Sequence, residues 1–241
     1  MKNFLKLLNL FNMNIVISGY GKMGQEIESV VKSRGGKCIA VLTKSESLRK
    51  TILQDSICID FTTPEAFRKN YKHICNNFKA AVVGTTGWND IKDEVIGYFK
   101  DKNKTLIYAT NFSIGVNIFF KITELSSKII STLTNYDAYI VEMHHKQKID
   151  APSGTAKTLE KILEDNLSKK AEIHSIRSGY IKGIHEVGYE SEVDRITLKH
   201  EAYTRKGFAE GAVTAAEWTD DISGVYEFKE LLENKFKEIK L

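Results

Sequence analysis

The chain has 241 residues, 42% hydrophobic and 27% charged, a composition typical of a folded globular protein. Its 35 basic and 31 acidic residues are interspersed, which excludes the basic arm of a nucleic-acid-binding protein, and the net charge of +4 suits a small anionic ligand. No apolar run is long enough to span a membrane, and the three cysteines have no disulfide or zinc spacing, so we expect a cytoplasmic protein.

Residues 1–12 form an apolar stretch with two lysines, which has some likeness to a signal peptide. Lys6 interrupts the stretch, and no small-residue cleavage site follows it. We therefore expect an N-terminal extension ahead of a natural start at Met13.

From Asn14 onward, short apolar strands alternate with amphipathic helices. The expected strands cover residues 15–18, 37–42, 56–61, 79–84 and 105–109. One helix is expected to open at Thr63-Pro64-Glu65, with Thr63 as its N-cap. The strands are too apolar for a sheet with one solvent-exposed face, so they predict a Rossmann-like, doubly wound parallel sheet with helices on both faces.

The pattern changes after Asn111. A long helix is expected over 114–133, a strand over 138–145, a helix after Gly154, and strands over 175–184 and 194–203. This order predicts a C-terminal α+β domain with a mixed sheet. We assign 1–110, with 1–12 as the extension, to a dinucleotide-binding domain. This domain is completed by about 212–241, where 224–226 can return to the first sheet. We assign 111–211 to a substrate-binding and oligomerisation domain.

Gly19-Tyr-Gly-Lys-Met-Gly24 is a GxGxxG motif between the first strand and the first helix. Gly19 allows the tight turn, Gly21 lets a pyrophosphate approach the backbone, and Gly24 lets the helix pack closely. The anion would then bind at a helix N-terminus. A tight turn without a ligand is the alternative interpretation.

The second strand ends at Thr43-Lys44, where a carboxylate for the adenine ribose is typical. Lys44 can pair with a 2′-phosphate, which allows NADPH, or it is a solvated loop charge. The choice between NADPH and NADH stays open. Gly84-Thr-Thr-Gly87 and Ala109-Thr-Asn-Phe112 follow two further strands, at the edge where ligands bind in such folds.

The segment from Glu142 to Thr155 carries His144, His145 and Lys148 before the helix start at Pro152–Thr155. Neighbouring residues of a strand point to opposite faces, so His144 and His145 cannot readily share a metal ion, and no metal site is expected. The imidazoles and lysines offer acids, and the free N–H groups of the helix start suit an anion. The alternative is a pair of core histidines beside solvated lysines. Two further histidines, His185 and His200, are expected on strand faces or in the core.

These segments resemble the 4-hydroxy-tetrahydrodipicolinate reductases, also called dihydrodipicolinate reductases. The resemblance extends over nearly the whole chain from Asn14. It rests on 19–24, 59–62, 84–88, 111–117, 142–155, 177–185 and 208–212, and 142–155 is its most specific part. It implies the NADPH- or NADH-dependent reduction of a small cyclic dicarboxylate to tetrahydrodipicolinate, in lysine biosynthesis. It also implies a homotetramer built through the second domain, with no nucleic acid or membrane as partner.

By the same resemblance, His144 and Lys148 are the proton donors, and His145, Gly154 and Thr155 hold the substrate carboxylates. The expected cofactor contacts are Gly19, Tyr20, Gly21, Lys22, Met23, Gly24, Lys44, Gly84, Thr85, Thr86, Ala109, Thr110, Asn111 and Phe112. The glycine turn is one residue shorter than in many members, and Thr43 stands where many have an acid. The competing hypotheses are a Rossmann oxidoreductase for another small acid and an inactive nucleotide-binding sensor.

Overall fold

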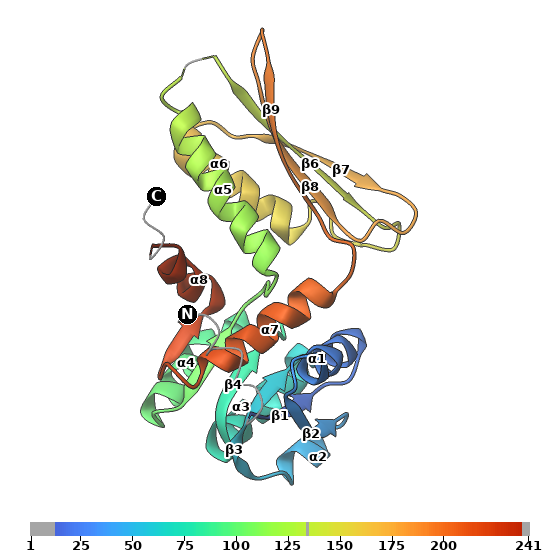
Figure 1. Ribbon diagram of the computed structural model, residues 1–241, viewed down its shortest axis with the longest axis vertical. Helices are drawn as coiled ribbons and strands as arrows, with labels where there is room; N and C mark the ends of the chain where they lie inside the picture. Colours follow the sequence, from blue (N-terminus) through green and yellow to red (C-terminus); the bar gives the residue numbers. More distant parts are fainter. Residues whose placement is uncertain (1–12, 134, 238–241) are drawn as a thin grey trace. The chain divides into compact units, whose positions relative to one another are not determined.

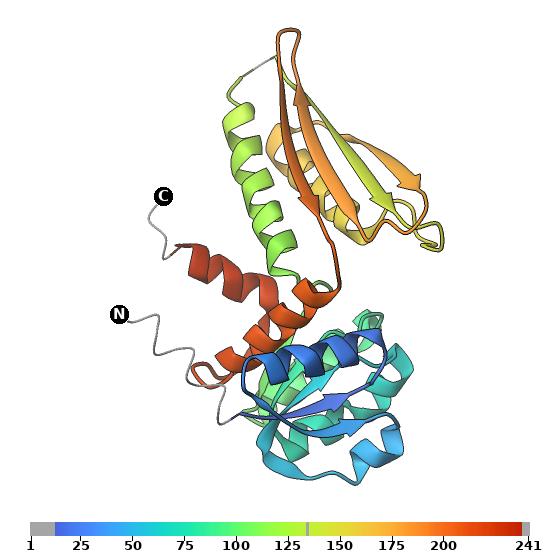
Figure 2. The ribbon, with the colours of Figure 1, turned by 45° about the vertical axis from the view of Figure 1, so that its right-hand side comes forward.

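The computed structural model describes residues 13–133 and 135–237, so the extension expected at 1–12 lies outside the described residues. The chain divides into two compact units (Figures 1 and 2). The first unit combines the residues up to Ser113 with those from Arg205 onward, and the second is Ile114–Thr204. None of the helices in the described ranges has both the length and the apolar character needed to cross a bilayer.

Six strands within the described ranges form the sheet of the first unit, in the order β10-β5-β4-β3-β1-β2, and all neighbours are parallel. They are β1 (Asn14–Ser18), β2 (Lys37–Leu42), β3 (Leu53–Asp60), β4 (Phe78–Val83), β5 (Thr105–Tyr108) and β10 (Val225–Glu227). The predicted Rossmann-like sheet is confirmed, including the return of the chain at 225–227. The strand order reverses between β1 and β3, and folds of this type bind their ligands at that point.

Helices pack against this sheet and against one another, α1 with α7 and α3 with α4. The bounds are α1 (Lys22–Ser33), α2 (Ser45–Arg49), α3 (Pro64–Asn77), η2 (Asn89–Ile91), α4 (Lys92–Asp101), α7 (Lys206–Trp218) and α8 (Phe228–Lys237). The start of α3 is as predicted, because the Thr63 side chain accepts a hydrogen bond from the backbone N–H of Ala66. Phe67, Tyr71 and Ile74 on its inner face lie in the apolar core.

The chain re-enters the first unit at Arg205, just before α7, whereas the sequence pattern placed this return at about residue 212. Small buried residues along α7 bring the helix close to the rest of the unit. A Cβ on Gly211 would lie only 1.8 Å from the carbonyl oxygen of Phe112, so this approach requires glycine. The sequence alone does not reveal that the first turns of α7 already pack there.

The second unit is a four-stranded sheet within the described residues, in the order β7-β6-β8-β9, with two helices on one face. The bounds are α5 (Ile114–Ile130), β6 (Asp137–His144), α6 (Gly154–Leu167), β7 (Glu172–Arg177), β8 (Ile184–Glu190) and β9 (Arg195–Glu201). Strand β6 is parallel to β7 and antiparallel to β8, and β8 is antiparallel to β9, so the predicted mixed sheet is confirmed.

One strand prediction was wrong. Residues 175–184 are not a single strand, because β7 ends at Arg177 and β8 begins at Ile184. Strand β8 contains Gly188, and a glycine in a short apolar pattern indicates a break. Here the glycine is needed for packing, since a Cβ on Gly188 would lie 2.2 Å from the ring of Tyr139 on the neighbouring strand.

Candidate functional site

The glycine-rich turn lies at the carboxyl end of β1, beside the end of β3. Gly19 has a φ of +91°, and a Cβ on it would lie 2.4 Å from the carbonyl oxygen of Phe61. A Cβ on Gly24 would lie 2.2 Å from the carbonyl oxygen of Gly19, so these two glycines close the turn and seat α1 on it. A Cβ on Gly21, by contrast, would meet nothing within 4 Å. The space above Gly21 is therefore open to a ligand.

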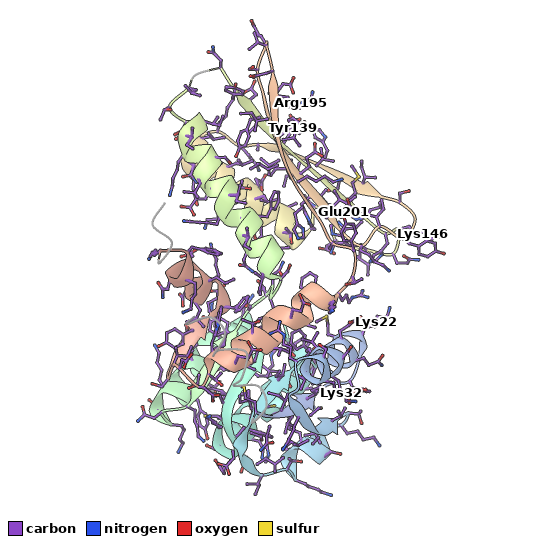
Figure 3. All side chains as sticks on the ribbon, in the orientation of Figure 1. Lys22, Lys32, Tyr139, Lys146, Arg195 and Glu201 are labelled. Carbon is purple, nitrogen blue, oxygen red and sulfur yellow. The ribbon has the colours of Figure 1, made fainter. Side chains whose placement is uncertain are left out.

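The N-terminus of α1 has the character of an anion site. Gly21 is its N-cap and makes no side-chain hydrogen bond to the helix, and the first turn contains no acidic residue. The first N–H groups of a helix have no partner within it, and they attract negative charge. Lys22, in this first turn, is exposed and adds a cation (Figure 3).

Asp60, at the end of β3, is fully buried and connects the loops around the turn. Its carboxylate accepts hydrogen bonds from the hydroxyls of Ser18 (2.7 Å), Thr85 (2.6 Å) and Thr62 (2.9 Å). Thr85 Oγ1 accepts in turn from the backbone N–H of Thr62 at 2.7 Å. Burial raises the pKa of Asp60, and these hydrogen bonds oppose the rise. One carboxylate therefore fixes the ends of three adjacent strands.

The other predicted cofactor residues differ in what they can offer. Lys44, Thr86 and Thr110 are exposed, and the Tyr20 hydroxyl donates a hydrogen bond to Glu28. The Phe112 ring is buried against Phe61 and Phe228, at centroid distances of 6.0 and 4.9 Å. Phe112 can therefore contact a ligand through its main chain only.

In the second unit, a buried polar network occupies the end of β6. Glu142 and His144 lie on the same face of the strand, and a carboxylate oxygen of Glu142 pairs with Nδ1 of His144. Arg177 Nη2 donates to the other oxygen at 2.6 Å. Burial alone would raise the pKa of Glu142, but hydrogen bonds from Arg177 and Ser175 outweigh it and hold that pKa below its usual range. Glu142 is therefore a buried carboxylate with fixed partners.

His185, on β8, joins the network across the sheet. Its backbone lies opposite Glu142, and its ring packs edge-on to that of His144 with centroids 5.1 Å apart. Its Nε2 is 3.1 Å from Oγ of Ser153, the N-cap of α6, whose hydroxyl oxygen also accepts from the N–H of Ala156. The histidine cluster is thus hydrogen-bonded to the helix start that carries Gly154 and Thr155.

Burial lowers the pKa of each of the three imidazoles in and beside this network. Burial lowers the pKa of His144 below its ordinary value, and the Glu142 carboxylate partly opposes this effect. Burial, reinforced by the charge on His144, lowers the pKa of His185 to about 4. Burial also lowers the pKa of His200, the cross-strand neighbour of His185. A negatively charged ligand would favour the protonated form of His144.

The loop after β6 carries the predicted lysine. Lys148 Nζ donates to a carboxylate oxygen of Asp150 at 2.7 Å, and the Lys148 backbone N–H donates to the carbonyl oxygen of His145 at 3.1 Å. The carbonyl oxygen of Asp150 accepts from Arg177 Nη2 at 2.6 Å. The peptide between Ala151 and Pro152 is cis and leads into α6. The predicted catalytic and carboxylate-binding residues thus come from one strand end, one loop and one helix start.

One group within the described residues has the spacing of a metal site. Glu142, His144 and His185 each offer an atom within 4.8 Å of the others. Both carboxylate oxygens of Glu142 are already engaged, and the Arg177 cation lies beside them. A divalent ion would have to displace these partners next to a fixed positive charge. Glu142 is better described as a carboxylate that forms an ion pair with Arg177 and a hydrogen bond with His144, and the expectation of no metal site stays a prediction.

Sequence reasoning assigned no role to Glu142, Arg177 or His185. Glu142 could have been found, because it precedes His144 by two positions in a strand and so shares its face. Arg177 and His185 reach the site through strand register, opposite His144 and Glu142 respectively. No local pattern indicates that register.

A cavity of about 400 Å³ lies elsewhere in the second unit, lined by Ile130, Tyr136, Asp137 and Lys170 among others. None of the predicted site residues lines it. It begins near the start of β6, whereas His144 ends that strand. The cavity is therefore separate from the predicted site residues.

Comparison with known proteins gives matches along most of the chain. The family model for the dihydrodipicolinate reductase N-terminus matches residues 13–112, and the model for the C-terminus matches residues 115–232. The chain is 39% identical to the 4-hydroxy-tetrahydrodipicolinate reductase of Christiangramia forsetii, over 93% of this chain and 100% of the relative. It is 34% identical to that of Thermosipho africanus, over 92% of this chain and 98% of the relative.

A solved structure shares the fold. Dipicolinate-bound dihydrodipicolinate reductase from Paenisporosarcina sp. TG-14 is 24% identical, with a TM-score of 0.73, and the match covers 89% of this chain and 97% of that chain.

Proposed function

Because the chain belongs to the dihydrodipicolinate reductase family, we propose that it is a 4-hydroxy-tetrahydrodipicolinate reductase acting in the cytoplasm. It reduces the cyclic dicarboxylate made by the preceding synthase to tetrahydrodipicolinate, on the diaminopimelate route to lysine. One observation carries the proposal beyond the family: the buried Glu142–His144 pair lies in the same network as the start of α6. It combines an acid with a receptor for a carboxylate.

The proposed chemistry divides between the cofactor and the side chains. A bound reduced nicotinamide would supply the hydride to a carbon of the conjugated imine. His144, and Lys148 as the second donor, deliver the proton as negative charge develops on the substrate ring. The N–H groups at Gly154 and Thr155, with His145, hold the carboxylates and stabilise that charge. The 4-hydroxyl group leaves as water to give the conjugated imine, and the hydride and the proton then account for the two electrons and the two hydrogens that this imine gains.

The glycine turn is the proposed site of the cofactor pyrophosphate. The open space at Gly21 and the uncapped start of α1 fit a phosphate group. Lys44, exposed at the start of α2, is the proposed contact of a 2′-phosphate, so NADPH is bound at least as well as NADH. Asp60 and Thr85 keep the adjoining loops in place.

We further propose a homotetramer that forms through the second unit. The helices cover one face of its sheet, where Ile140 is buried. Alternation places Tyr139, Val141 and Met143 of β6 on the other face, with Ile176 of β7, which is 42% exposed, beside them. An apolar patch on an uncovered sheet face is typical of a subunit interface. Light scattering should give the mass of four chains, and Ile176→Asp should give smaller species.

The deciding experiment follows the oxidation of NADPH and of NADH with freshly made synthase product. We expect turnover with the wild-type protein. His144→Ala and Lys148→Ala should each lower kcat by about 10² to 10⁴ while cofactor affinity stays near normal. Lys161→Ala, at an exposed position on α6 of the same unit, is the matched control. A folded protein that binds cofactor and does not turn over the synthase product would refute the specific function.

A further inference from the structure

We propose that Glu142 is a positioning residue for the proton donor His144, and that Arg177 connects this pair to the loop that carries Lys148. The inference rests on the proposed function, because it deepens the account of the same site. It assigns roles to two residues that do not themselves contact the substrate.

Glu142 is held in place by partners on both of its carboxylate oxygens. Its side chain is fully buried, and a buried carboxylate is stable only when its oxygens have partners. One oxygen pairs with His144 Nδ1 and the other accepts from Arg177 Nη2 at 2.6 Å. Arg177 is itself only 17% exposed, so solvent screens this ion pair little. Glu142 is therefore held in one place and in its charged form.

Glu142 also determines which nitrogen of His144 can give up a proton. A carboxylate only accepts hydrogen bonds, so Nδ1 of His144 carries a hydrogen in both charge states of the ring. The proton that the ring gains and loses is then the one on Nε2. A Cβ on Gly183 would lie 3.2 Å from this Nε2, so a side chain there would press on it. Glu142 thus selects the tautomer, and Gly183 leaves the donating nitrogen accessible.

The guanidinium group of Arg177 connects the two proposed proton donors, His144 and Lys148. Arg177 Nη2 donates to Glu142 at 2.6 Å and also to the carbonyl oxygen of Asp150 at 2.6 Å. The side chain of Asp150 accepts from Lys148 Nζ at 2.7 Å. A continuous set of contacts therefore runs from His144 through Glu142, Arg177 and Asp150 to Lys148. Movement of the loop would disturb the same arginine that keeps Glu142 in place.

The charges that face His144 give the pair a second effect. Arg177 approaches from β7, Lys148 from the loop after β6, and His185 from β8, with His200 of β9 behind it. The two cations and the burial all disfavour the protonated ring. Glu142 is the anionic group among the described residues that pairs directly with it. Without that carboxylate, His144 would be protonated only at more acidic pH.

Two variants separate positioning from a structural role. Glu142→Gln keeps the size of the side chain and an acceptor for Arg177, but its amide no longer requires a hydrogen on His144 Nδ1. We expect kcat to fall by about 10² to 10⁴, with KM changed only a few-fold. Glu164→Gln, at an exposed position on α6, is the matched control and should behave like the wild-type protein.

The readout that a structural role would not move is nitrogen-15 NMR of His144 in the protein without ligands. In the wild-type protein, the neutral ring should carry its hydrogen on Nδ1. In Glu142→Gln, that tautomer should no longer dominate, and the pKa of His144 should fall by about 1 to 3 pH units. Because no turnover is measured, this result stands or falls separately from the proposed function.

A wild-type tautomer and pKa in Glu142→Gln would overturn the proposal, as would an unchanged kcat. If Glu142→Gln does not fold, Glu142→Asp decides. Its carboxylate is one methylene shorter, so contact with His144 should be lost in part and kcat should fall at least about tenfold. An unchanged kcat in Glu142→Asp would equally overturn the proposal.

Discussion

Replacing His185 tests how far the buried network depends on a neutral imidazole. Burial and the adjacent His144 lower the pKa of His185 to about 4, against about 6.5 in an unfolded chain. The folded state therefore resists protonation at this position. The stability that neutral His185 provides is fully present above pH 6.5 and is lost as the pH falls toward 4. The gap between the two values corresponds to about 3 kcal/mol.

The variant His185→Gln does not titrate and can still hydrogen-bond to Ser153. Urea unfolding of both proteins at pH 7.5 and at pH 4 gives the difference in their free energies of unfolding. Between pH 7.5 and pH 4, the wild-type protein should lose about 3 kcal/mol more free energy of unfolding than the variant does. Lys161→Gln, at an exposed position on α6, is the control for a surface substitution. An equal difference at both pH values would refute the reasoning.

Four other predictions follow from the same contacts. Gly21→Ala should weaken cofactor binding about tenfold or more without loss of stability. Gly24→Ala should instead lower the free energy of unfolding by about 1 to 3 kcal/mol, because a Cβ on Gly24 would meet a carbonyl oxygen at 2.2 Å. Asp60→Ala, which leaves three hydroxyls without their acceptor, should cost about 1 to 3 kcal/mol in chemical unfolding and weaken cofactor binding. Lys44→Ala should weaken NADPH more than NADH in a fluorescence titration, and an unchanged ratio would mean that this lysine faces solvent. If His144 donates as the protonated ring, kcat/KM should fall as the pH rises through a pKa below 6.5. The fall in kcat should come at a higher pH, because the bound dicarboxylate favours the protonated ring. Coincident pH profiles of kcat and kcat/KM would contradict this.

Much of the fold could be predicted because its signals are local. Strand β2 has the predicted bounds, since an uninterrupted apolar run is flanked by turn residues. The start of α3 follows from Thr63 and Pro64 alone. Strand β8 could not be predicted in this way, because Gly188 is explained only by the Tyr139 ring on the strand beside it. Local sequence patterns thus predict most helices and strands. A strand such as β8, which depends on a contact with another strand, cannot be predicted from them.

The candidate site divides in the same manner. His144, Lys148 and the start of α6 are close in sequence, and their juxtaposition is a local property. Arg177 lies beyond an entire helix and strand, and its parallel register opposite His144 brings it to the site. The segment 177–185 contributes to the family resemblance, but its sequence does not show that Arg177 reaches Glu142.

The inward face of the second sheet shows why the network can exist at all. Along β6 this face passes from Ile140 to Glu142 and His144, and along β8 it passes from Tyr189 and Val187 to His185. The apolar half packs with the helices into the core, and the polar half continues the same rows of side chains at the end where α6 begins. Apolar burial at one end thus holds the strands in register, and that register fixes the distances between the charged groups at the other. A one-residue slip of β8 would turn His185 to the outer face and leave Glu142 facing a different side chain. The core therefore specifies the geometry around His144, the proposed proton donor, as directly as the polar residues do.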